Sequence, residues 1–141
     1  EELLLPKDVM PELKDYHTAE IALDFFVENG RIVWANGALR LFHKDLPGIE
    51  AGHFNPYTPD DSIIQQVQQA AEKLGVTFGP LKADFMQDER YGWVLQEMAV
   101  RLSGGFDSSY TCPLATGKDI YGAYLDMALG LPLDRGKLED K

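Results

Sequence analysis

Lys82-Ala83-Asp84-Phe85-Met86 and Glu97-Met98-Ala99-Val100-Arg101 are two runs rich in strand-forming residues, separated by a polar segment that includes Gly92. Two such runs around a glycine-containing turn predict a β-hairpin. Side chains alternate between the two faces of a strand, so residues two apart share a face. The hairpin would therefore gather charged side chains from both runs on one face of a sheet.

The register of this hairpin sets which charges meet. If Asp88 pairs with Trp93, then Asp84 lies opposite Glu97. In this register one face of the second strand carries Trp93, Leu95, Glu97, Ala99 and Arg101. Facing carboxylates about 5 Å apart at Cβ destabilise a hairpin unless cations neutralise them. A hard cation such as Mg²⁺ binds carboxylate oxygens, usually together with substrate phosphates. An acidic pair alone, without the residues around it, is more often a solvated face than a metal site.

The segment 79–105 resembles the metal-binding hairpin of ATP-grasp ligases, which include D-alanine–D-alanine ligase, biotin carboxylase and carbamoyl-phosphate synthetase. Their usual pattern is a basic residue, one spacer, an acid and, after a longer spacer, Glu-x-Asn-x-Arg. The matching residues here are Lys82, Asp84, Glu97 and Arg101. Ala99 stands at the Asn position, so one metal ligand is missing and the number of bound metals is open. The following residues, 101–109, look closest to the carbamoyl-phosphate-synthetase-like and amino-acid ligase branches.

The resemblance implies an ATP-dependent ligase that activates a small carboxylate substrate as an acyl phosphate, which an amine or similar nucleophile attacks. The implied cofactors are ATP and Mg²⁺ (or Mn²⁺), with Asp84 and Glu97 as metal ligands. Lys82 and Arg101 would be the catalytic cations. Glu20 would bind the ribose of ATP, or be an ordinary strand-terminal residue. The backbone N–H groups of Ser103, Gly104 and Gly105 would bind the substrate, or the two glycines would only form a turn.

The composition is that of a folded globular protein, because 45% of the 141 residues are hydrophobic and 11% are aromatic. A net charge of −10 argues against nucleic acid as a partner, since phosphate contacts dominate such binding. The single cysteine, Cys112, excludes an internal disulfide framework and indicates a reducing, cytoplasmic compartment. We interpret it as a small, half-buried apolar residue rather than a nucleophile. The sequence contains no long apolar run and no signal peptide, so we expect no membrane partner.

The chain begins at Glu1-Glu2-Leu3-Leu4 without an initiator Met, and this opening resembles the hinge between the two lobes of ATP-grasp enzymes. We expect a hinge-like lead-in at 1–19, a C-terminal ATP-grasp lobe at 20–130 and a polar, frayed tail at 131–141. The partner would be the missing N-terminal lobe, so this fragment alone is expected to be inactive. The alternative is a non-catalytic or degenerate lobe that serves in assembly. The sequence leaves a homo-oligomer open.

The fold class predicted is α+β: an antiparallel sheet of at least four strands with helices on one face. Asn29-Gly30 predicts a type I′ hairpin turn, and Asn36-Gly37 a second turn. Residues 43–57 read as a loop, in which His53 is a candidate for contact with the site. The helices expected are one from an N-cap at Thr58 to Gly75 and one over about 116–129. A loop over 102–113 would lie between the hairpin and the second helix.

Overall fold

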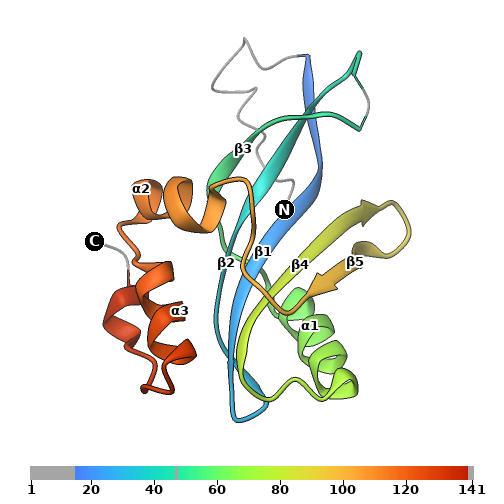
Figure 1. The fold of residues 1–141 in the computed structure, drawn as a ribbon. Helices are drawn as coiled ribbons and strands as arrows, with labels where there is room; N and C mark the ends of the chain where they lie inside the picture. The colour runs from blue at the N-terminus through green and yellow to red at the C-terminus, as the bar shows by residue number, and fades with distance from the viewer. Residues whose placement is uncertain (1–14, 47, 140–141) are drawn as a thin grey trace.

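A computed structural model describes residues 15–46 and 48–139. The expected hinge at 1–14 lies outside the described residues. Five antiparallel strands form one sheet in the order β3-β2-β1-β4-β5 (Figure 1). The strands are β1 (Tyr16–Glu28), β2 (Arg31–His43), β3 (Glu50–Tyr57), β4 (Gly79–Asp88) and β5 (Gly92–Ala99). The helices are α1 (Asp61–Leu74), α2 (Cys112–Thr116) and α3 (Ile120–Ala128), with short helical turns η3 (Asp107–Thr111) and η4 (Arg135–Leu138). The predicted α+β class is confirmed.

Each face of the sheet has its own hydrophobic core. On one face α1 covers β1, β2 and β4, and the buried side chains are Ile21, Leu23, Phe25, Val27, Leu39, Ile63, Val67, Ala71, Leu81, Ala83 and Phe85. On the other face Phe26 packs against α2, α3 and η4, together with Leu102, Cys112, Ile120, Ala123, Met127 and Leu138. Helices on a single face were therefore a wrong prediction. On this face of β1 the apolar Phe26 lies between the polar residues Asp24 and Glu28. Helices α2, α3 and η4 cover its side chain.

The predicted turn between β1 and β2 is confirmed, because Asn29 and Gly30 both have positive φ, 51° and 73°. The second predicted turn is wrong. Asn36 and Gly37 lie buried in the middle of an unbroken β2. Gly37 pairs with Leu23 of β1, and a Cβ at Gly37 would lie 2.3 Å from the Ala22 carbonyl oxygen. The glycine serves close packing of two strands rather than a turn.

Two boundaries also differ from the prediction. The segment 43–57 contains strand β3, which pairs with β2 at the edge of the sheet, where a proline such as Pro56 is tolerated. Helix α1 is capped by Asp60, whose carboxylate accepts the Ile63 N–H at 3.0 Å, and not by Thr58. Its end at Gly75, in the left-handed conformation, is as predicted.

The C-terminal part is more ordered than expected. The turn η3 and helix α2 fill most of the predicted loop, and α3 begins at Ile120 after the cap Asp119. The prediction of a frayed tail is wrong for the described residues up to Glu139, which include the helical turn η4. Leu138 is buried, and Lys137 Nζ lies 2.6 Å from the Asp126 carboxylate of α3. Among the described residues, no helix is both long and apolar enough to cross a membrane.

Candidate functional site

The predicted pairing of Asp84 with Glu97 is confirmed, although the register assumed for it was wrong. At the tip of the hairpin Asp88 pairs with Gly92, and Phe85 pairs with Leu95. The register then shifts, so Asp84 pairs with Glu97 and Gln96 is the extra residue of a β-bulge. The bulge leaves Trp93 and Leu95 packed towards α1. The single shared face predicted for 93–101 is therefore wrong, and Glu97 faces the side opposite α1.

A second bulge acts in the β1–β2 hairpin. Val27 pairs with Ile32, but Phe26 pairs with Trp34, so Val33 is extra. Without this shift Glu20 would face Leu39; with it, Glu20 pairs with Arg40. The face opposite α1 then has two polar rows across the sheet, namely Ala38–Ala22–Asp84–Glu97 and Asn36–Asp24–Lys82–Ala99.

Arg40 is at the centre of an acidic cluster that the sequence interpretation missed. Its guanidinium lies 3.1 Å from the Glu20 carboxylate, 3.3 Å from Asp84 and 3.5 Å from Glu50. Lys82 Nζ contacts the other oxygen of Asp84, and both side chains are largely buried. The buried carboxylate of Asp84 therefore has a cation on each side. In the sequence, Arg40 is a cation in a strand expected to pair with the strand of Glu20. Without the bulge the register places Leu39 opposite Glu20, so the pairing with Arg40 could not be predicted.

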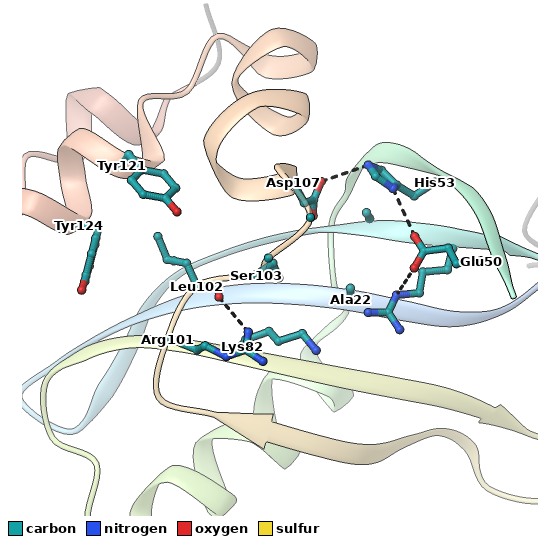
Figure 2. Close-up of a pocket in the computed structure, with 14 residues that line it drawn as sticks. Ala22, Glu50, His53, Lys82, Arg101, Leu102, Ser103, Asp107, Tyr121 and Tyr124 are labelled. Atoms are coloured by element: carbon teal, nitrogen blue, oxygen red, sulfur yellow. Dashed lines mark hydrogen bonds and ion pairs between the residues drawn. The ribbon is translucent and has the colours of Figure 1, made fainter. Parts of the chain in front are cut away.

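A cavity of about 620 Å³ opens beside these rows (Figure 2). Its floor is Ala22 and Ala38, whose small side chains leave the space. The other lining residues are Arg40, Glu50, His53, Lys82, Arg101, Leu102, Ser103, Gly104, Gly105, Asp107, Tyr121 and Tyr124. The two predicted catalytic cations therefore line one cavity together with the predicted substrate loop. Glu20, Asp84 and Glu97 lie on the same face of the sheet without lining the cavity.

The loop 103–105 is attached to the sheet by a buried carboxylate. The Ser103 N–H donates to Asp24 Oδ1 at 2.7 Å, and the Ser108 hydroxyl donates to Asp24 Oδ2. The Ser103 amide is thus already used, which corrects the expectation that it faces a substrate. Gly104 and Gly105 are exposed at the cavity. The sequence analysis did not identify Asp24 as a site residue. An acid between apolar neighbours in a predicted strand was the feature that could have indicated it.

The candidate His53 does line the cavity, on the side of β3 and η3. Its Nδ1 lies 3.4 Å from Glu50, and its Nε2 lies 3.4 Å from Asp107 and 3.2 Å from the Thr111 hydroxyl. Asn55 donates to the same Asp107 oxygen at 2.6 Å. This polar wall faces the cations Lys82 and Arg101 across the cavity, as Figure 2 shows.

The carboxylate pair fits a magnesium ion by its chemistry. Hard oxygen donors suit Mg²⁺, which commonly takes one or two carboxylates and completes its coordination with water and phosphate oxygens. Within the described residues no group of three or more His, Cys, Asp and Glu side chains is arranged to hold a metal ion by itself. Asp84 and Glu97, on paired strands, are two oxygen donors of this kind.

Cys112 has no features of a nucleophile. It is 2% exposed, accepts a hydrogen bond from the Asn36 amide at 2.9 Å, and burial raises the pKa of its thiol. A raised pKa disfavours the reactive thiolate. The interpretation as a small apolar residue is confirmed, with fuller burial than expected.

Asp24 should make stability depend on pH. Burial raises the pKa of Asp24 above the ordinary 3.8, and the hydrogen bonds from Ser108 and Ser103 oppose this only in part. Below pH 3.8 both the folded and the unfolded chain carry the proton. As the pH rises from there to the raised value, only the unfolded chain ionises freely, so stability is lost.

We expect Asp24→Asn to gain stability relative to the unmodified protein as the pH rises above 3.8, by about 1.4 kcal/mol for each unit by which the pKa is raised. Urea unfolding of both proteins across this range measures the difference, because the other titrating groups cancel. A difference that is constant with pH would contradict the assignment.

Comparisons with known proteins identify the architecture. Models of protein families give no match, and neither do curated protein sequences. Among solved structures, the L-amino acid ligase from Bacillus licheniformis superposes with a TM-score of 0.65 at 21% identity, over 85% of this chain and 31% of that chain. The phosphoribosylaminoimidazole carboxylase ATPase subunit from Aquifex aeolicus gives 0.61 at 16% identity, over 82% and 35%. Both are ATP-grasp ligases. This is the fold of an ATP-grasp lobe.

A third ATP-grasp structure shows ligands. The biotin carboxylase domain of the Hydrogenobacter thermophilus 2-oxoglutarate carboxylase, solved with MgADP, ADP and bicarbonate, superposes with a TM-score of 0.57 at 17% identity, over 85% of this chain and 26% of that chain. The chain thus spans about a third or less of the length of these ATP-grasp enzymes. This chain contains the five-stranded sheet and the hairpin β4–β5, where the candidate residues lie.

Proposed function

We propose that this chain is the C-terminal lobe of an ATP- and Mg²⁺-dependent ligase that activates a small carboxylate as an acyl phosphate for attack by an amine or a similar nucleophile. One observation carries the proposal. The hairpin β4–β5 pairs Asp84 with Glu97 and places Lys82 on the same face, beside a cavity that Arg101 also lines. The ATP-grasp fold of the chain supports it.

The reaction needs charge neutralisation more than covalent help from the protein. A carboxylate is a poor acyl donor, and phosphorylation by the γ-phosphoryl group of ATP gives it a good leaving group. Positioning and electrostatic stabilisation dominate such transfers. Lys82 and Arg101, which line the same cavity, would stabilise the negative charge on the transferred phosphoryl group. The exposed Gly104 and Gly105 would let an anion approach the backbone closely.

The acidic residues would serve the nucleotide. Asp84 and Glu97 would hold the metal, and Mg²⁺ when bound would supply positive charge next to the phosphates. Asp84 is paired with Lys82 and Arg40, so these cations would hold its carboxylate until the metal binds. The Glu20 carboxylate lies 3.1 Å from Arg40, which orients it. In this position it could accept hydrogen bonds from ribose hydroxyls.

A second candidate is a non-catalytic lobe that serves in assembly. Ala99 favours it, because this position pairs with Lys82 and has no side-chain oxygen to offer a metal. The exposed apolar side chains of the C-terminal helices, such as Leu114, Leu125 and Leu129, also fit a contact surface. The two candidates differ in one measurable property, which is the formation of an acyl phosphate.

Trapping with hydroxylamine tests the proposal. We expect the complete protein, comprising both lobes, to form hydroxamates from a panel of carboxylates in the presence of ATP and Mg²⁺, because hydroxylamine captures acyl phosphates. The 141-residue chain alone should form none, since nucleotide binding needs both lobes. A complete, folded protein that releases neither hydroxamate nor ADP with any carboxylate would favour the assembly role.

A further inference from the structure

We propose that Asp24 is a positioning residue for the loop 103–105, and that the ability of this loop to bind an anion in the cavity depends on it. The residue lies on β1 in the interior of the sheet, 4% exposed, and it pairs across strands with Lys82. It is separated from Ser103 by 79 positions, so only the fold brings them together. The inference rests on the proposed function to the extent that the loop binds a substrate anion there.

Three buried residues form the connection. Asp24 Oδ1 accepts the Ser103 N–H at 2.7 Å, and Oδ2 accepts from the Ser108 hydroxyl. The Ser108 oxygen also lies 3.1 Å from the Ser103 carbonyl oxygen. Ser103 is 7% exposed and Ser108 is 0% exposed, so water does not compete for these hydrogen bonds. Asp24 thus holds the Ser103 N–H, and Ser108, whose single hydroxyl proton goes to Asp24, lies beside the Ser103 carbonyl.

The loop beyond Ser103 needs such an anchor because its backbone is strained at Phe106. Gly105 and Phe106 both have positive φ, 63° and 65°. A bulky residue such as Phe106 adopts this conformation only at a cost in free energy. The Phe106 side chain is 76% exposed, so its own packing contributes little to offset the cost. The buried hydrogen bonds at Ser103 and Ser108, on either side of Gly105 and Phe106, fix the ends of this segment.

The consequence for the cavity is geometric. Ser103, Gly104 and Gly105 line it together with Lys82 and Arg101. An anion bound there would meet the two cations and the backbone of the exposed glycines, whose N–H groups could bind it only while the loop keeps this path. Removing the side chain of Asp24 should therefore weaken anion binding. Electrostatics alone predicts the opposite, because loss of a carboxyl near the site favours an anion.

The test uses the complete protein, comprising both lobes, with inorganic phosphate as the probe, titrated by NMR and followed at the amides of 103–105. We expect Asp24→Ala to bind phosphate at least tenfold more weakly than the unmodified chain. Asp24→Asn should stay within twofold, because its oxygen still accepts the Ser103 N–H and its amide can donate to Ser108. The matched control is Asp107→Asn, which also removes a carboxyl lining the cavity but leaves Asp24 in place; phosphate should bind equally or more tightly.

Hydrogen exchange of the Ser103 amide is the second measurement, and it does not require a ligand. We expect strong protection in the unmodified chain and in Asp24→Asn, and loss of protection in Asp24→Ala. If Asp24→Ala does not fold, Ser108→Ala replaces it, with a two- to fivefold weaker phosphate affinity expected. Undiminished phosphate binding in a folded Asp24→Ala, or an unprotected Ser103 amide in the unmodified chain, would overturn the role of Asp24. Absence of phosphate binding in the unmodified complete protein, with Ser103 protected, would overturn the anion site of the proposed function instead.

Discussion

Glu97→Gln is expected to reduce the turnover of the complete enzyme by about 10²–10³-fold while changing the KM for ATP much less. Glu97 is exposed on β5 and pairs with the buried Asp84, so the substitution keeps the shape and the fold. What it removes is a negative charge from the proposed metal site, and this loss matters most where phosphoryl charge develops in the transition state.

The control for this prediction is Glu89→Gln, the same substitution at the exposed tip of the same hairpin. It should leave both turnover and KM unchanged. Steady-state kinetics of the three proteins at saturating Mg²⁺ measures the effect. Unchanged turnover in Glu97→Gln would mean that other side chains hold the metal.

Gly37→Ala should destabilise the chain by about 3 kcal/mol or more, or prevent folding. The new Cβ would lie 2.3 Å from the Ala22 carbonyl oxygen and 2.3 Å from Leu23 Cδ2. Leu23 is fully buried and Ala22 is held in the central strand β1, so neither can move away without opening the β1–β2 pairing.

Gly52→Ala is the matched control, because Gly52 lies on the neighbouring strand β3 and a Cβ there meets nothing within 4 Å. It should change stability by no more than about 0.5 kcal/mol. The midpoint of urea unfolding compares the two variants. Equal midpoints would show that the β1–β2 pair can separate enough to accept a methyl group.

Local signals were sufficient for several elements of this protein. Asn29-Gly30 supplies the positive φ values of a tight turn, Gly75 ends α1, and the strand runs around residues 87–92 form the hairpin β4–β5. Each depends on the conformational preferences of a few adjacent residues. The pairing of Asp84 with Glu97 was predicted from a register that is wrong at the hairpin tip, and the bulge at Gln96 is what brings the two carboxylates opposite each other. The likeness to ATP-grasp ligases followed from that hairpin.

The bulges at Val33 and Gln96 were not predictable, because adding one residue costs little locally and only the packing of both faces shows where it occurs. In β2, Ile32 and Ala35 pack towards α1 while Val33 and Trp34 pack towards the helices on the opposite face. This arrangement brings Arg40 opposite Glu20.

The sequence by itself thus determined the hairpins β1–β2 and β4–β5 and the helix α1, since neighbouring residues specify these. Only the tertiary structure decided that helices cover both faces and that Asp24 holds the loop at Ser103. Contacts of this kind join segments far apart in the chain. They form where the free energy gained by burying side chains such as Phe26 exceeds the entropic cost of closing long loops. The residues next to one another in the sequence do not reveal whether that burial exceeds the cost.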